Sequence, residues 1–116
     1  MRRLERKPGA RADIKAIRAY SRRVFGAGAQ HKYGALMKRA FVMLCADPQR
    51  SGVQQCEDLP GFNLFHLRLA RTRGGSPKDA RHILVFTYDD TTLTILRVLH
   101  DSMDITQQIT NENDEG

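Results

Sequence analysis

Apolar and basic residues alternate at helical spacing near the start of the chain. One side of the repeat carries apolar or small residues and the other side carries basic ones: Ile14, Ile17, Ser21 and Val24 against Arg11, Lys15, Arg18 and Arg22. Because residues three and four apart share one face of a helix, the pattern predicts an amphipathic helix with a basic outer face. Pro8 suits the first helical position, and Gly26 is expected to end the helix in a left-handed conformation.

A second helical repeat follows at residues 29–46. Its apolar stripe consists of Tyr33, Leu36, Met37, Ala40, Phe41 and Leu44. Asp47 and Pro48 are expected to end this helix, since proline cannot continue the helical hydrogen bonding. The link between the two helices is short, so they are expected to form an antiparallel helical hairpin with the apolar stripe in the core.

Three later runs have the composition and length of strands: residues 63–71, 81–88 and 92–100. Residues 89–91 form a tight turn, which makes the last two runs a hairpin. Glycine and proline mark residues 72–80 as a flexible loop, and residues 48–61 show no periodicity. Residues 1–7 are interpreted as either an edge strand or a frayed arm.

This order of elements is typical of an α+β fold. An N-terminal antiparallel helical hairpin is expected to pack on a small antiparallel β-sheet of three to four strands. A chain of 116 residues suits a single domain, here assigned to residues 1–108. Residues 109–116 are polar and acidic, and they are expected to be a disordered tail.

Side-chain alternation divides each predicted strand into two faces. The sets without arginine are Phe65, Leu67, Leu69, Leu84, Phe86, Tyr88, Leu96 and Val98. If these sets face the helices, the other face carries Arg68, Arg81 and Arg97 among aliphatic residues, which predicts a contact surface for a partner. The alternative is that these arginines extend from a covered face and pair with carboxylates. A single β-bulge would invert the assignment.

Charge is distributed unevenly along the chain. Residues 1–50 hold 13 Lys and Arg against 3 acidic residues, whereas residues 51–116 hold 6 against 10. A basic first half suits an acidic partner, either a nucleic acid or an acidic protein. No run has the roughly 18 apolar residues of a membrane span, and the N-terminus has no apolar segment of a secretory signal, so a cytoplasmic protein is expected. Cys45 and Cys56 lack the spacing of a zinc site and are expected to be free structural thiols.

The chain resembles the ParE toxins of the RelE/ParE superfamily. Five segments carry the resemblance: RADIKAIRAYSRRVFG, KYGALMKRAFVMLCADP, GFNLFHLRLARTR, RHILVFTYDD and RVLHDSMD. It covers residues 11–108, and its most specific parts are Arg81-His82 and residues 97–104. The loop at residues 72–80 is longer than in the shortest members. The resemblance implies a toxin held inactive by an acidic, ParD-like antitoxin and acting on DNA gyrase, without a cofactor, metal or catalytic residue of its own.

A set of six residues is expected to bind partners: His66, Arg68, Arg81, Arg97, His100 and Met103. Asp101 and Asp104 follow the last predicted strand, where they are expected to cap a short helical turn. Met103 is expected to anchor that turn against the sheet.

The alternative is a RelE-type endoribonuclease that cleaves mRNA. Such cleavage needs a base, an acid and cations for the developing phosphorane charge. Arginine does not deprotonate near neutral pH, so the base would be His66, His82 or His100. Strand alternation places His82 and His100 away from Arg81 and Arg97, which disfavours this alternative. Direct sequence-specific nucleic-acid binding outside an antitoxin complex is not expected, since the chain shows no helix-turn-helix motif and no interleaved aromatic residues.

Overall fold

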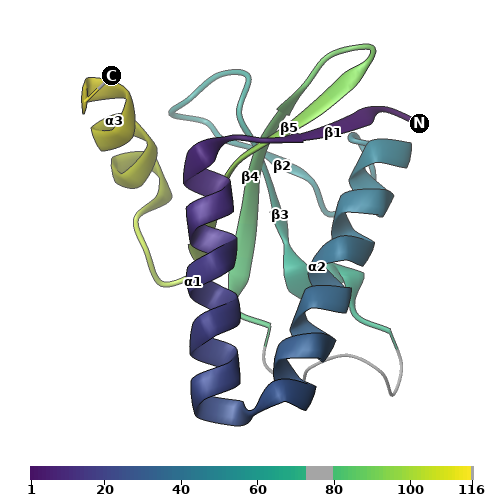
Figure 1. Cartoon of the computed structure of the whole chain (residues 1–116). Helices are drawn as coiled ribbons and strands as arrows, with labels where there is room; N and C mark the ends of the chain where they lie inside the picture. The colour runs from purple at the N-terminus through teal and green to yellow at the C-terminus, as the bar shows by residue number, and fades with distance from the viewer. Residues whose placement is uncertain (73–79, 116) are drawn as a thin grey trace.

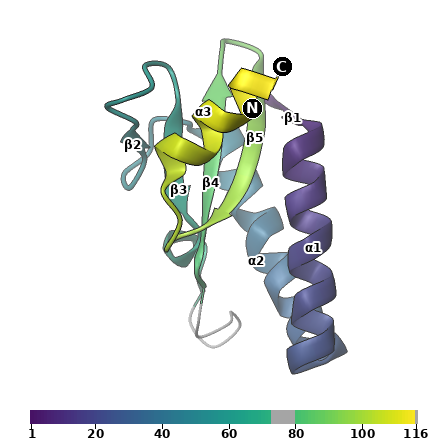
Figure 2. The same cartoon turned by 90° about the vertical axis from the view of Figure 1, so that its left-hand side faces the viewer.

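The computed structural model describes residues 1–72 and 80–115, with side chains as far as Thr110. The elements follow one another as β1 (Arg3–Arg6), α1 (Pro8–Phe25), α2 (Ala27–Ala46), β2 (Gln54–Gln55), β3 (Asn63–His66), a 3-10 helix η1 (Leu67–Ala70), β4 (His82–Tyr88), β5 (Thr92–His100) and α3 (Ile105–Glu115). Helices α1 and α2 run side by side over one face of the sheet, and α3 lies on the other face (Figures 1 and 2). The α+β class and the helical hairpin are therefore confirmed. Most of the loop predicted at residues 72–80 lies outside the described residues.

The sheet has five strands and is mixed, in contrast to the predicted antiparallel sheet of three to four. Its strand order is β1-β5-β4-β3-β2. The edge strand β1 runs parallel to β5, with Arg3 opposite Thr92 and Arg6 opposite Ile95, while the other pairs are antiparallel. Residues 1–7 thus contain an edge strand. The two-residue strand β2 was missed because two glutamines give no alternation of apolar and polar residues.

The helical hairpin turns at Gly26, which has φ 95°, a conformation that side-chain-bearing residues rarely adopt. Helix α1 begins at Pro8 as predicted, and the whole predicted apolar stripe of α2 is buried. In α1 the buried residues are Ala10 and Ser21, whereas the side chain of Val24 is 49% exposed. The prediction that Val24 belongs to the inner face is therefore wrong.

The main core lies between the hairpin and the sheet. Its sheet side is formed by Phe65, Leu84, Phe86, Leu93, Ile95 and Val98, and Leu67 of η1 joins the same core. Leu93 and Ile95 were predicted on the opposite face. The difference arises from a β-bulge, because Val85 lies opposite Arg97 while Phe86 lies opposite Ile95. Leu96 is the extra residue, and it packs on the second face.

The first predicted strand is also shorter than expected, because the chain leaves the sheet after His66. The Nδ1 atom of His66 accepts a hydrogen bond from the backbone N–H of Arg68 at 3.1 Å, which caps the 3-10 helix η1. Alternation therefore stops there. Leu67 and Ala70 are buried, whereas Arg68 and Leu69 are exposed.

The second face of the sheet is covered instead of forming the predicted open surface. Val85 and Leu99 pack against Ile109 of α3, which is 3% exposed. The partly buried residues around this second cluster are Leu59, Phe62, Leu64, Leu96 and Ile105. The segment predicted as a disordered tail is instead helical as far as Glu115, and Ile109 packs the helix against the sheet. No helix in the described part of the chain is long and apolar enough to cross a membrane.

Candidate functional site

The ends of the three central strands bring together residues that are far apart in sequence. His66 ends β3, His82 begins β4 and His100 ends β5. Antiparallel pairing places His82 directly opposite His100, with ring centroids 5.5 Å apart in an edge-to-face arrangement. Asp101 joins them, because its backbone N–H donates to the carbonyl of Arg81 at 2.7 Å. We call His66, Arg81, His82, His100 and Asp101 the strand-end cluster.

Hydrogen bonds hold several polar atoms of this cluster. The Nε2–H of His66 donates to Oδ2 of Asp101 at 3.0 Å. Nδ1 of His100 lies 2.7 Å from Oγ of Ser102. The hydrogen bond from His66 holds the pKa of the Asp101 carboxyl below its usual value, and the nearby Arg81 guanidinium acts in the same direction. Asp101 therefore stays ionised and gives the cluster one fixed negative charge.

His82 is the most perturbed group of the cluster. Its Nδ1 lies 2.5 Å from the hydroxyl of Tyr33 on α2, and the two rings pack edge to face. Burial and, to a smaller extent, the neighbouring His100 lower the pKa of His82 to about 4, against an opposing effect of Asp101. His82 is therefore neutral near pH 7, and it ties α2 to the sheet.

We expect the protein to lose stability as the pH falls from about 6.5 to about 4, because folding must keep His82 neutral. The contribution of neutral His82 to the free energy of unfolding is complete above its unfolded-state pKa of 6.5. It is lost as the pH falls from there through the folded-state pKa of about 4. Urea unfolding midpoints measured across this range would show the decline. A His82→Gln variant should flatten it, whereas His31→Gln, at an exposed position of α2, should leave it unchanged. An equal slope in wild type and His82→Gln would contradict the assignment.

Arg97 pairs with a carboxylate instead of lying on an open face of the sheet. Its Nε donates to Oδ2 of Asp13 at 2.7 Å and its terminal nitrogen donates to Oδ1 at 3.0 Å. The same Oδ2 accepts the backbone N–H of Val98 at 2.9 Å. Both side chains of the pair are less than one-fifth exposed. The arginine expected at the open face instead fastens α1 to β5, which is the pairing that the alternative interpretation allowed.

A hollow of about 400 Å³ opens beside the strand-end cluster. It is lined by Ile17, Tyr20, Ser21, Phe25, Ala29, Lys32, Tyr33, Arg81, His82 and His100. Tyr20 and Phe25 are 53% and 68% exposed, and their rings meet edge to face at 6.3 Å. Aromatic side chains beside cations at a cavity are typical of residues that dominate protein–protein binding. We call this site the aromatic hollow.

The six predicted partner-binding residues do not form one site. His66, Arg81 and His100 belong to the strand-end cluster, and Arg97 is a structural residue. Arg68 lies in η1 and lines a separate shallow hollow with Leu69. Met103 is 46% exposed and does not anchor the turn after β5, a role taken by Ile105 and Ile109.

The aromatic residues of the hollow were missed in the sequence. Tyr20 and Phe25 lie in α1 outside its inward-facing residues, and aromatic residues on the polar side of an amphipathic helix are the signal that marks them. Within residues 1–72 and 80–115, no group of three or more histidine, cysteine or acidic residues is arranged to hold a metal ion. Cys45 and Cys56 are free thiols, as predicted.

Comparisons with known proteins found one matching family and several similar structures, each over most of the chain. Residues 4–105 match the family model of the ParE toxin of the type II toxin–antitoxin system parDE. The structure is similar to that of a chromosomal ParDE system from P. aeruginosa, with a TM-score of 0.63 at 19% identity over 86% of this chain and 96% of the other. It is also similar to the E. coli DinJ–YafQ toxin–antitoxin complex, with a TM-score of 0.60 at 14% identity over 90% and 97% of the two chains. A search of curated protein sequences found no match.

Proposed function

This chain belongs to the ParE toxin family of type II toxin–antitoxin systems, and we propose that a ParD-like antitoxin holds it inactive and that the released toxin inhibits DNA gyrase. The family match over residues 4–105 carries this proposal, because it extends from the first strand to the start of the last helix. Gyrase as the target is what the resemblance to ParE toxins implies. An inhibitor that acts by binding needs a contact surface and no reacting group.

The aromatic hollow supports a binding role. Tyr20 and Phe25 offer apolar contact area, while Lys32 and Arg81 line the same hollow. This combination suits an apolar side chain of a partner flanked by carboxylates. We assign the hollow to the target and not to the antitoxin, so toxicity and antitoxin binding should be separable by substitution.

We expect the purified chain to make gyrase accumulate cleaved plasmid DNA, and the cognate antitoxin to prevent this. A Phe25→Ala/Arg81→Ala variant should need at least about tenfold more protein for the same cleavage, since loss of hot-spot residues costs 2 kcal/mol or more. Its affinity for the antitoxin should stay within about threefold of wild type, a difference of less than 1 kcal/mol. Val42→Ala, at an exposed apolar position of α2, is the matched control. Plasmid DNA that remains uncleaved by gyrase at a saturating concentration of the purified chain would contradict the gyrase proposal.

A second candidate is cleavage of mRNA, which the strand-end cluster favours more than strand alternation had suggested. His66, His82, His100 and Arg81 gather at one end of the three central strands instead of being separated on opposite faces. His82 and His66 are poor general bases, however. His82 is half-buried and bonded to Tyr33, and both ring nitrogens of His66 have partners. His100 has its Nδ1 engaged by Ser102 and a side chain that is 41% exposed. Rapid mRNA loss on induction, abolished by His100→Gln, would favour the nuclease.

A further inference from the structure

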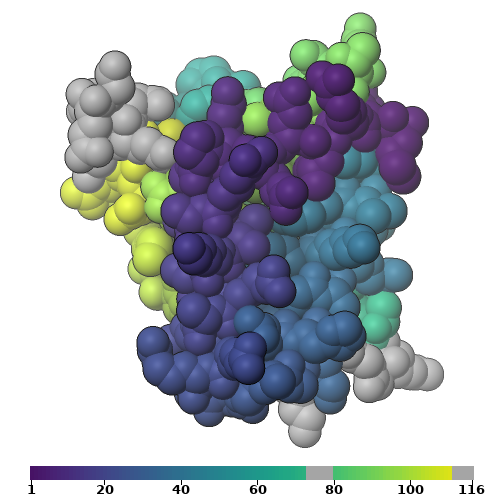
Figure 3. Space-filling model, viewed as in Figure 1, coloured from purple at the N-terminus to yellow at the C-terminus, as the bar shows by residue number. Residues whose placement is uncertain are grey.

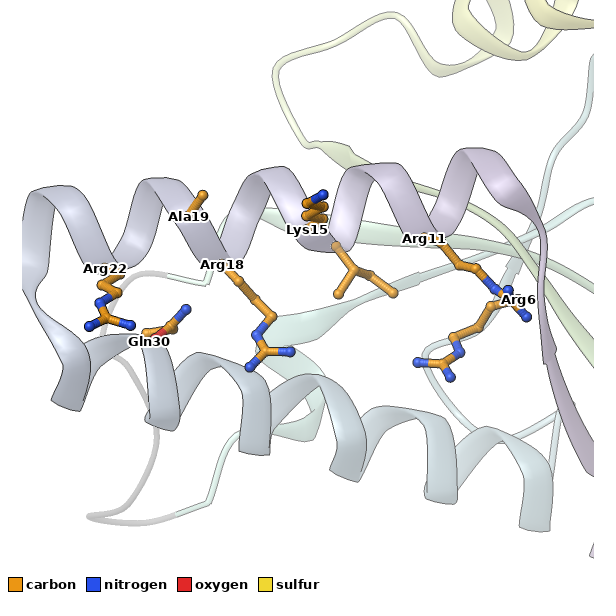
Figure 4. A pocket seen from close by; sticks show the side chains of 8 residues that line it. Arg6, Arg11, Lys15, Arg18, Ala19, Arg22 and Gln30 are labelled. Atoms are coloured by element: carbon orange, nitrogen blue, oxygen red, sulfur yellow. The ribbon is translucent and has the colours of Figure 1, made fainter.

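A second hollow, of about 640 Å³, lies on the outer side of the helical hairpin, away from the strand-end cluster. Its lining consists of Arg6, Arg11, Ile14, Lys15, Arg18, Ala19, Arg22 and Gln30. Figure 4 shows Arg6 and Arg11 at one end of this hollow and Arg22 with Gln30 at the other. The space-filling view shows that α1 and α2 form one broad face of the molecule (Figure 3). We call this hollow the basic groove.

The cations of α1 form a single row along the basic groove. Arg11, Lys15, Arg18 and Arg22 are spaced four, three and four residues apart, so they share one helix face over about 16 Å of axis. All four side chains are exposed. Among the described residues, none of the four lies within ion-pair distance of a carboxylate. The acidic residue of α1, Asp13, is turned to Arg97 on β5.

The groove lacks what a protein partner would use as an anchor. The exposed large apolar residues of the described chain are Met1, Tyr20, Val24, Phe25, Val42, Leu69 and Met103, and none of them lines the groove. A neighbouring hollow shares Arg6, Ile14 and Arg18. The apolar residues beneath it, Met37 and Phe41, are only 3% and 7% exposed, so they offer a partner almost no contact area. Protein interfaces depend on buried aromatic or aliphatic anchors, whereas a phosphate backbone requires only cations.

We propose that the basic groove binds the sugar–phosphate backbone of double-stranded DNA without reading its sequence. A row of arginine and lysine along one helix of a chain with a pI of about 9.8 is the electrostatic pattern of backbone binding. Duplex DNA is favoured over a single strand because no aromatic residue lines the groove for base stacking. This binding goes beyond gyrase inhibition and requires neither gyrase nor the antitoxin.

The test measures the affinity of the purified full chain for a labelled duplex of arbitrary sequence, of about 20 base pairs, across a series of salt concentrations. Four phosphate contacts predict a slope of log K against log salt of about −3.6, or about 150-fold weaker binding between 50 and 200 mM salt. Replacing Arg11, Lys15, Arg18 and Arg22 with Gln should reduce affinity at least 100-fold at the lower salt concentration. Replacing Arg3, Arg23, Lys32 and Arg50 with Gln removes the same charge outside the groove and should cost less than tenfold.

Two single substitutions provide a test that does not depend on the folding of the variant with four replacements. Ala19→Glu places a carboxylate in the groove, whereas Ala16→Glu adds the same charge at an exposed position of α1 that does not line it. The first should weaken DNA binding several-fold more than the second. Equal losses within either matched pair would overturn the proposal, because they would show a general charge effect. Poly-glutamate binding more tightly than the duplex would also overturn it and would identify the groove as an acidic-peptide site.

Discussion

An Asp13→Ala variant is expected to lose about 3 kcal/mol of its free energy of unfolding. The carboxylate of Asp13 accepts two hydrogen bonds from Arg97 and one from the backbone N–H of Val98, all at 3.0 Å or less. Removing it leaves a guanidinium with less than one-fifth of its side chain exposed beside an unsatisfied N–H group. Since these bonds join residues 84 and 85 positions apart, their loss also loosens α1 from β5.

Chemical denaturation of Asp13→Ala, Arg97→Ala and three further variants would measure this effect. Asp13→Asn keeps a carbonyl acceptor, so it should lose about half as much as Asp13→Ala. Glu57→Ala, at an exposed position in the loop before β3, should change the free energy of unfolding by less than about 0.5 kcal/mol. The double variant Asp13→Ala/Arg97→Ala should be less destabilised than the sum of the single changes. Additive losses would show that the pair contributes no interaction energy.

An Ile109→Asp variant is expected to release α3 from the sheet at a cost of about 2–4 kcal/mol. Ile109 is 3% exposed against Val85 and Leu99, and an ionised carboxylate cannot stay in that apolar contact. Release of the helix is less costly than burial of the charge, so the second face of the sheet becomes exposed to solvent. The protein should remain folded, since the main core between the hairpin and the sheet does not include this contact.

Hydrogen exchange and binding of a fluorescent apolar dye would detect the released helix. Thr110→Asp introduces the same carboxylate one position later, where the side chain is exposed, so it serves as the matched control. Amides of α3 should exchange quickly in Ile109→Asp and at the wild-type rate in Thr110→Asp. Unchanged dye binding in both variants would contradict the packing of α3 on the sheet.

Local patterns in the sequence were sufficient for the helical hairpin. The stripe from Tyr33 to Leu44 is buried throughout, because a helix packed on one side forces its apolar residues into one repeat. Pro8 and Gly26 gave the ends of α1 for reasons of backbone geometry. Patterns of this kind depend on residues three or four positions apart, so they can be recognised from the sequence alone.

Contacts between distant segments were not predictable in the same way. The bulge at Leu96 depends on how two strands fit together, and it reversed the face of Leu93 and Ile95. Arg97 looked like a surface cation because its partner, Asp13, lies 84 positions earlier. The strand-end cluster likewise appears only once three strands are aligned, since alternation within single strands separated His82 from Arg81.

The parallel pairing of β1 with β5 has a consequence for the order in which the protein folds. Arg3 pairs with Thr92, so the first strand has no neighbour in the sheet until residue 92 has been synthesised. At a translation rate of about 5–20 residues per second, β5 is completed several seconds after β1. Asp13 also has no ion-pair partner before that point, because Arg97 follows Thr92 in the same strand. A chain that stops before residue 92 lacks both attachments, so β1 and α1 can reach their native contacts with the sheet only after β5 has been synthesised.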